Sequence, residues 1–266
     1  MDLLQELLRG LTREEVLQLL VLGALGMAGG TLAGLAGVGG GIVFVPALVY
    51  VAGWEIQEAV AASLVIIIFA SLTGTWRNQK SEDPVAWRTA FILSSAVAPA
   101  TLIGVYISTI SSSVVVEVAF SALLLALAYP TARGRPNFDE SSRKIPVPLV
   151  LLAGLFIGAL AGLVGVGGGV VLVPLMVLGL GLTTKRAVST SLAVVMFAGV
   201  VGSIGYIAAG FSDLVALAPL VAGSMVGAVL GVRLRDLLPG RAISMGFAVF
   251  MVVTALRTLA GVAGIL

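Results

Sequence analysis

The 266-residue chain is 59% hydrophobic and 11% charged, with a formal net charge of +2. Because a water-soluble domain carries about a quarter of its residues as charged side chains, this composition excludes a soluble protein. The chain has no Cys and no His, which excludes disulfides and thiolate chemistry and removes the commonest general base and metal ligand. Apolar runs long enough to cross a bilayer recur along the sequence, and they predict an all-α polytopic membrane protein.

Residues 1–15 precede the first long apolar segment. Leucines at helical spacing in MDLLQELLRGL predict a short N-terminal helix that lies at the membrane interface. Acidic residues stand where a signal peptide would carry basic ones, so we do not expect a cleaved leader. Thr12 and Glu15 form a capping-box pattern that predicts the start of the first long helix.

Ten hydrophobic segments follow this stretch. They cover residues 16–38, 41–53, 58–76, 89–109, 113–130, 146–166, 169–182, 187–209, 213–232 and 241–265. Residues 131–145, rich in Pro, Ser, Gly and charge, are predicted to be a cytoplasmic linker. The linker separates a first transmembrane repeat, residues 16–130, from a second, residues 146–266.

The second and seventh segments, 41–53 and 169–182, are short for a membrane crossing. About 13 residues at 1.5 Å each give roughly 20 Å, against a hydrocarbon core of ~30 Å. We therefore expect eight to ten spans, with glycine-broken or re-entrant helices at these two segments.

One glycine-rich phrase appears in both repeats, 128 residues apart. GLAGVGGGIVFVPALV begins at Gly34 and GLVGVGGGVVLVPLMV at Gly162, and from Leu32 to Val49 against Leu160 to Val177 13 of 18 positions are identical. The same register pairs Ser63 with Ser191 further along. Internal repeats of this kind build many transporter folds. Since each repeat has an odd number of segments, five, the second repeat is predicted to be inverted relative to the first.

Basic residues gather in a few loops. Of the 15 Lys and Arg residues, 12 lie in loops 77–88, 131–145, 183–186 and 233–241. Every one of these loops follows an odd-numbered segment, so all are expected on one face. The positive-inside rule makes that face cytoplasmic and leaves both termini outside, in the cell membrane. Because the basic residues do not form one continuous stripe, we expect no nucleic-acid partner.

The repeated glycines predict where a substrate binds. Consecutive glycines let a helix backbone open, and the free N–H groups of the next helix start attract an anion. Two inverted copies would bring two such starts together near the membrane midplane. The predicted substrate-binding residues are Gly39, Gly40, Gly41, Pro46, Ser63, Gly167, Gly168, Gly169, Pro174, Thr190 and Ser191.

Other interpretations of these residues stay open. The spacing of Gly30–Gly34 and of Gly158–Gly162 suits close helix packing, and the triple glycines could serve packing as well. Ser63 and Ser191 could donate hydrogen bonds to a substrate or to a neighbouring helix. Pro46 is expected at or near the first turn of its helix, where a missing N–H has no cost.

The doubled phrase, followed by AVAASL in the first repeat and AVSTSL in the second, resembles the sulfite exporter TauE/SafE family of membrane permeases. GYIAAGFSDLVALAPLVAGSMVGAVLGVRL, which begins at Gly205, resembles the same family, and the likeness covers nearly the whole chain. The stretch TWRNQKSEDPVAWR departs from it, since the family pattern has a shorter turn there. On this chain the family's function would carry over to Gly39–Gly41 with Pro46 and to Gly167–Gly169 with Pro174.

The resemblance implies a secondary transporter of small sulfur-containing anions, such as sulfite or organosulfonates, that uses no cofactor and no metal. A channel-like anion facilitator and a non-transporting membrane scaffold subunit are the alternatives. An enzyme is not expected, because no His, Cys or mid-span carboxylate pair supplies an acid, base or nucleophile. The expected partners are a small anion and the lipid bilayer, and the oligomeric state is left open.

Overall fold

The computed structural model describes residues 13–37, 39–133, 146–211, 217–234 and 240–264. These residues form ten α-helices and no strand, so the prediction of an all-α chain with ten hydrophobic segments is confirmed. The helices are α2 (Arg13–Ala36), α3 (Gly41–Tyr50), α4 (Ile56–Asn78), α5 (Trp87–Ile110), α6 (Ser113–Ala132), α7 (Val147–Val164), α8 (Gly169–Leu180), α9 (Thr184–Ala208), α10 (Ala218–Leu234) and α11 (Gly240–Val262). The expected interfacial helix lies outside the described residues except for 13–15, which already belong to α2. Most of the linker, 134–145, also lies outside them.

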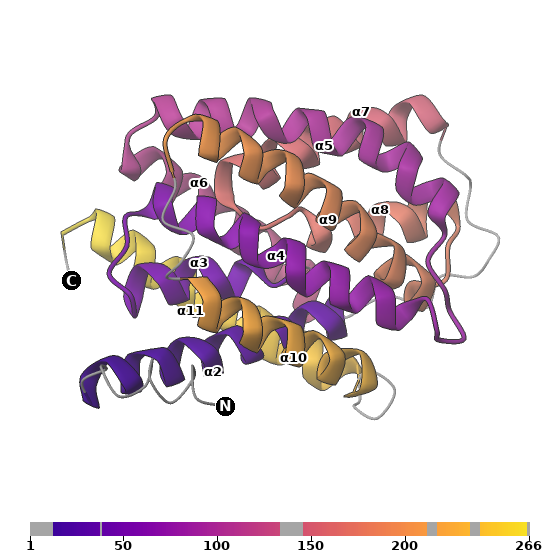
Figure 1. Cartoon of the computed structure of the whole chain (residues 1–266). Coiled ribbons are helices and arrows are strands. Elements are labelled where there is room, and N and C mark those ends of the chain that lie inside the picture. The colour runs from indigo at the N-terminus through magenta and orange to yellow at the C-terminus, as the bar shows by residue number, and fades with distance from the viewer. Residues whose placement is uncertain (1–12, 38, 134–145, 212–216, 235–239, 265–266) are drawn as a thin grey trace.

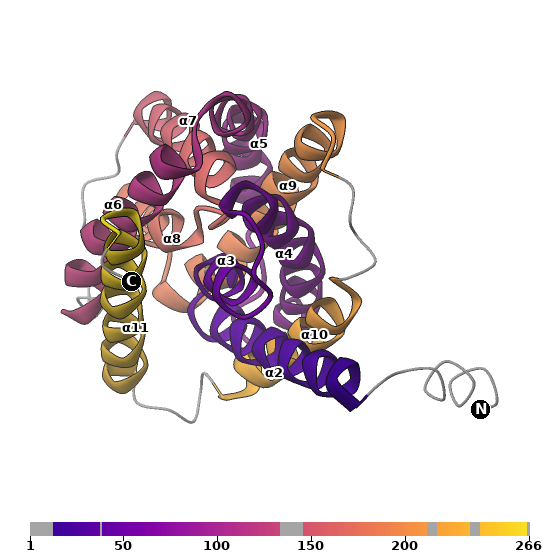
Figure 2. The same ribbon diagram turned by 90° about the vertical axis from the view of Figure 1, so that its left-hand side faces the viewer.

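Six of the helices are long and apolar enough to cross a membrane: α2, α4, α5, α6, α7 and α9. By contrast, α3 and α8 have 10 and 12 residues. At 1.5 Å per residue they are about 15 and 18 Å long, well short of a ~30 Å hydrocarbon core. Figure 2 shows both short helices inside a ring of the longer ones. The expectation of broken helices at these two segments is therefore confirmed.

Two hydrogen bonds between connections, one at each end, mark the opposite ends of the helix bundle, and Figure 1 shows the α4–α5 connection at one end and the α3–α4 connection at the other. At one end Thr183 Oγ1 donates to Asp83 Oδ1 at 3.4 Å, which joins the α4–α5 and α8–α9 connections. At the other, Gln57 Nε2 donates to Ser111 O at 3.3 Å, which joins the start of α4 to the α5–α6 turn. We name the first the basic end and the second the acidic end. The described charged residues near the basic end are Arg77, Lys80, Glu82, Asp83, Arg88, Lys185 and Arg186, and those near the acidic end include Glu55, Glu58, Glu117 and, on α11, Arg257.

The two repeats are interleaved, because the first helix of each packs along the fourth helix of the other: α2 on α10, and α7 on α5. Glycines allow these close approaches. A Cβ added to Gly30 would overlap the carbonyl oxygen of Ser224, and one added to Gly227 would overlap that of Met27. Gly158 lies equally close to the carbonyl of Val97. The packing interpretation of the Gly30–Gly34 and Gly158–Gly162 spacing is thus confirmed.

Candidate functional site

Each repeated glycine phrase forms a sharp turn that ends in a short helix. Gly39–Gly40 have φ of 80° and 84°, and Gly167–Gly168 have φ of 74° and 73°, a left-handed backbone that residues with a Cβ adopt at a cost. Helices α3 and α8 begin immediately afterwards, and neither start has a side-chain cap. Since the first N–H groups of a helix have no acceptor inside it, both starts carry backbone donors.

The two turns touch each other in the middle of the molecule. A Cβ on Gly41 would overlap the carbonyl oxygen of Gly165. A Cβ on Gly39 or on Gly167 would lie 2.6 or 2.8 Å from the same atom, Cγ1 of Val195. Ile67, which is 128 residues before Val195, also lies against both turns, and both side chains are fully buried. These two apolar residues therefore close the centre where the turns meet.

Ser63 and Ser191 bind the glycine phrase of the opposite repeat. Ser63 Oγ lies 2.8 Å from Gly165 O and 2.8 Å from Val60 O of its own helix, and Ser191 Oγ lies 2.7 Å from Gly37 O and 2.9 Å from Val188 O, so each hydroxyl donates between an inter-repeat and an intrahelical carbonyl. A hydroxyl has a single proton to donate, so in this conformation both serines use it on backbone carbonyls. Sequence reasoning did not single out Gly37 and Gly165, although both stand in the repeated phrase and both have positive φ, 72° and 70°.

Three further residues of the predicted substrate site, Thr190, Pro46 and Pro174, lie outside the glycine turns themselves. Thr190 Oγ1 accepts a hydrogen bond from the Ala86 N–H at 3.0 Å, so Thr190 holds the α4–α5 connection against α9. Pro46 and Pro174 are each the sixth residue of their helix, α3 and α8, and so lie in the second turn rather than the first. Each helix begins at the third glycine of its phrase. The proline therefore falls at a position where another residue would donate its backbone N–H to the carbonyl four places earlier.

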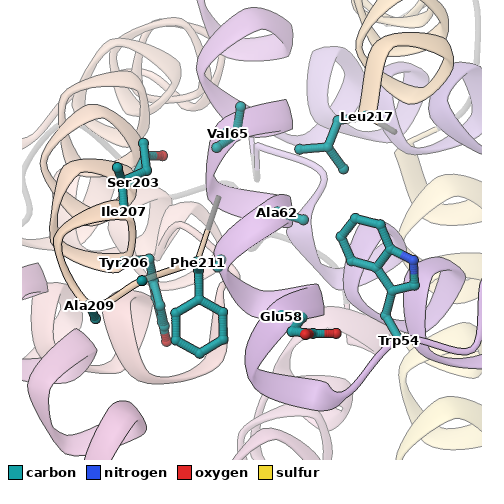
Figure 3. A pocket seen from close by; sticks show the side chains of 12 residues that line it. Trp54, Glu58, Ala62, Val65, Ser203, Tyr206, Ile207, Ala209, Phe211 and Leu217 are labelled. Carbon is teal, nitrogen blue, oxygen red and sulfur yellow. The ribbon is translucent and has the colours of Figure 1, made fainter. Parts of the chain in front are cut away.

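A cavity of about 420 Å³ opens at the acidic end, between the first half of α4, the last turns of α9 and the start of α10. Figure 3 shows Trp54 on one side of α4 and Tyr206 with Phe211 on the other. The cavity reaches as far as Val65 and Ser203. None of the predicted site residues lines it. Sequence reasoning missed the cavity because it depends on how α4, α9 and α10 are spaced, which no single segment encodes.

The polar groups of this cavity are few. Tyr206 Oη donates to Gly162 O at 2.9 Å, and Ser203 Oγ donates to Gly199 O at 2.7 Å. Glu58 is exposed at the mouth, and no Lys or Arg is among the lining residues. An anion that enters here would therefore find no described cation on the wall and would depend on neutral hydrogen-bond donors.

Two smaller cavities each include one predicted residue. Pro46 lines a cavity of about 260 Å³ between α3, α6 and α11. In that cavity the Arg257 guanidinium lies over the Tyr50 ring, 4.1 Å from its centroid. Gly168 lines an apolar cavity of about 10 Å³. Within the described residues, no group of three or more Asp and Glu could hold a metal ion.

Comparison with known proteins gives consistent matches. A family model described as Sulfite exporter TauE/SafE matches residues 22–258. The chain is 28% identical over 250 residues to the "Probable membrane transporter protein YunE" of Bacillus subtilis, covering 85% of this chain and 91% of that protein. It is 27% identical over 263 residues to a "Probable membrane transporter protein" of Haemophilus influenzae, covering 91% and 97%. No solved structure matches the chain significantly.

Proposed function

The chain belongs to the sulfite exporter TauE/SafE family, whose model matches nearly its whole length, and on this premise we propose that it is a secondary transporter of small sulfur-containing anions. Its relatives are named membrane transporter proteins, and its helices are those of a multi-pass membrane protein. The substrates we propose are sulfite or organosulfonates. The protein would move them without changing them chemically, and so would not act as an enzyme.

The observation that carries the proposal is the contact between two inverted, uncapped helix starts at the centre of the molecule. The starts of α3 and α8 approach from opposite directions, and each brings the positive end of a helix dipole. Two such starts are a ready-made site for an oxyanion, which accepts several N–H hydrogen bonds at once. We propose Gly39–Gly41 and Gly167–Gly169 as this site, with Pro46 and Pro174 shaping the helices that follow.

The serines and Thr190 have a different role in this proposal. Ser63 and Ser191 hold the two glycine turns in position through their bonds to Gly165 and Gly37. Their hydroxyl oxygens also lie next to the path that a substrate would take between the turns. Thr190 acts on the α4–α5 connection rather than on the substrate.

Access to the centre requires a conformational change. The 420 Å³ cavity supplies an entrance from the acidic end, and it stops at Val65, two residues before Ile67. Ile67 and Val195 lie against both glycine turns, so they must separate from the turns before a substrate can reach the N–H groups. A central closure of this kind favours alternating access over a permanently open pore.

We further propose that the basic end faces the cytoplasm of the cell that carries this protein in its membrane. Loops rich in Lys and Arg stay on the cytoplasmic side. The acidic end, with the 420 Å³ cavity, would then face outward.

The test is radiolabelled sulfite flux into proteoliposomes that contain the purified chain, with sulfate and taurine as competitors. We expect saturable flux that an accepted competitor reduces. Flux that rises linearly with concentration would instead favour a channel-like facilitator. If folded, inserted protein gives no flux above that of empty liposomes, sulfite is not the substrate, and other carboxylate and sulfonate anions should be tested in the same assay.

Three variants examine the site and its entrance within this assay. Gly40→Leu or Gly168→Leu should abolish flux in inserted protein, and wild-type flux in either would overturn the glycine site.

Glu58→Gln should lower the KM of an anion by about two- to fivefold at low salt, because a carboxylate a few ångströms from the entrance repels it by roughly 1 kcal/mol in water. A raised KM would contradict an anionic substrate entering at this cavity.

A further inference from the structure

One face of α4 carries three buried polar side chains that have no hydrogen-bond partner among the residues that the structure describes. Ser71, Thr75 and Asn78 are spaced by four and three residues, which places them on one side of the helix. Their exposed fractions are 0%, 4% and 0%. The hydroxyl oxygens of Ser71 and Thr75 and both amide atoms of Asn78 lack a partner. Because a buried polar group without a partner destabilises a fold, three in one row need an explanation.

This polar row, Ser71–Thr75–Asn78, runs from the centre of the molecule to the basic end. At the inner limit, a Cβ on Gly39 would lie 3.7 Å from Ser71 Oγ, so the row begins at a glycine turn. At the outer limit, Asn78 is the last residue of α4. Ile67 lies one turn before Ser71 on α4, so the row extends along the same helix face from the contact between the glycine turns toward the basic end.

The inverted repeat gives this row a counterpart. Adding 128 to each number leads to Gly199, Ser203 and Tyr206 on α9. Ser203 and Tyr206 line the open 420 Å³ cavity at the acidic end (Figure 3). The same face is therefore open in one repeat and closed in the other.

The wall of the 420 Å³ cavity that α4 forms shows the same correspondence between residues 128 positions apart. Ala61 and Ala62 of α4 line the open cavity, and their counterparts on α9 are Ser189 and Thr190, both fully buried. The closed end thus has hydroxyl side chains where the open end has methyl groups.

The connection between α4 and α5, residues 79–86, lies at the basic end and bonds to residues of α9 and of the α8–α9 connection. The Ala86 N–H bonds to Thr190 Oγ1 at 3.0 Å, and Asp83 accepts a longer bond from Thr183 at 3.4 Å. Val85 is 5% exposed and is the buried apolar side chain of this connection. Among the described residues, these two hydrogen bonds and Val85 join the connection to its surroundings, and breaking them would not break a helix.

We infer that Ser71, Thr75 and Asn78 line the basic-end half of the substrate route, as a second cavity that opens when residues 79–86 leave α9. The inference rests on the proposed transport function and adds to it the residues of the closed half. Hydroxyl and amide groups donate hydrogen bonds to an oxyanion without carrying a charge that would retain it. In the open state water and substrate would satisfy the groups that have no partner here.

The chain has no Cys, so single cysteines can be placed without removing others. Thr75→Cys should react with a membrane-impermeant, negatively charged methanethiosulfonate applied to the basic-end side of oriented vesicles. Ser203→Cys, the inverted counterpart, should react from the acidic-end side. Ser121→Cys is the matched control, because Ser121 on α6 is also buried without a hydrogen-bond partner. We expect Thr75→Cys to react about tenfold or more faster than this control, since thiol reactivity follows access.

A second variant reports on transport itself. Asn78→Leu replaces the unpartnered amide by an apolar group of similar size, which leaves a purely structural position folded and active. If the amide contacts the substrate, flux should fall by roughly tenfold or more, as expected when hydrogen bonds to a charged group are lost. Ser121→Ala should leave flux unchanged.

The labelling and flux results together distinguish a failure of the basic-end route from a failure of the proposed sulfite transport. If Thr75→Cys reacts no faster than Ser121→Cys and Asn78→Leu transports normally, the basic-end route is wrong even where sulfite flux is intact. If Thr75→Cys reacts from the basic-end side but the wild-type chain carries no sulfite, the route stands and the substrate assignment fails, because the labelling does not depend on the solute.

Discussion

At the scale of single residues, the serines explain how the two glycine turns keep their shape. Gly37 and Gly165 have positive φ, and a Cβ on either would lie 2.6 or 2.5 Å from the opposing serine Oγ. Gly37 and Gly165 must therefore be glycine for two reasons: only glycine adopts this backbone conformation readily, and a Cβ would occupy the space of the serine hydroxyl. Because the bonds cross between repeats, each half of the chain holds the centre of the other.

Ser63→Ala should destabilise the protein by about 1–3 kcal/mol, since Gly165 O would lose a partner at a buried position. Thermal unfolding of the purified protein in detergent measures the change. Ser121→Ala provides the comparison, because the Ser121 hydroxyl has no partner to lose, and it should alter stability by less than about 0.5 kcal/mol. Equal losses in the two variants would show that the bond to Gly165 contributes nothing of its own.

Residues that repeat could be predicted from the sequence, and residues that depend on packing could not. The glycine phrase drew attention to Gly39–Gly41 because it occurs twice, and the structure has those residues in a turn. The sequence left two partners open for the Ser63 hydroxyl, a substrate or a neighbouring helix, and only the packing shows which carbonyl it reaches. The lining of the 420 Å³ cavity was missed for the same reason, since Trp54 and Tyr206 meet only through tertiary packing.

At the scale of helices, length and glycine content predicted most of what is seen. The short segments are short helices, and the turns before them fall at the expected glycines. The prolines, expected at or near the first turn, lie in the second turn, because the helices begin at Gly41 and Gly169. The spacing of small residues predicted that α2 packs closely but not that its partner would be α10, because a small-residue face fits any similar face.

Gly227→Ala tests this helix pairing. The added methyl group would overlap the backbone carbonyl of Met27, which cannot rotate away, so α2 and α10 must separate. We expect a loss of about 1–3 kcal/mol in stability, the usual cost of overpacking. Gly246→Ala on α11 has no heavy atom within 4 Å of the new Cβ and should be neutral or stabilising by up to about 1 kcal/mol. Thermal unfolding of both variants decides whether the contact or the loss of a glycine matters.

At the scale of the whole molecule, the two sequence repeats correspond position by position, but their conformations differ. Loop charges predicted which connections share an end, and the described connections follow that prediction (Figure 1). The sequence does not predict which end is open, because the same repeats support either conformation. In the described residues the larger cavity beside α4 and α9 lies at the acidic end. Under the alternating-access mechanism that we propose, this asymmetry corresponds to one of the two states that the transporter visits.

Fixing the basic end closed should then stop transport. Asp83 and Thr183 come from different connections and approach within 3.4 Å, so the double variant Asp83→Cys/Thr183→Cys places two thiols within reach of a short bifunctional methanethiosulfonate. Cross-linked protein should carry no flux above empty liposomes, because residues 79–86 could no longer leave α9, and a reducing agent should restore it. Each single variant treated in the same way controls for loss of the native side chains. Undiminished flux through fully cross-linked protein would mean that the substrate does not pass this end, and the polar row on α4 would then need another explanation.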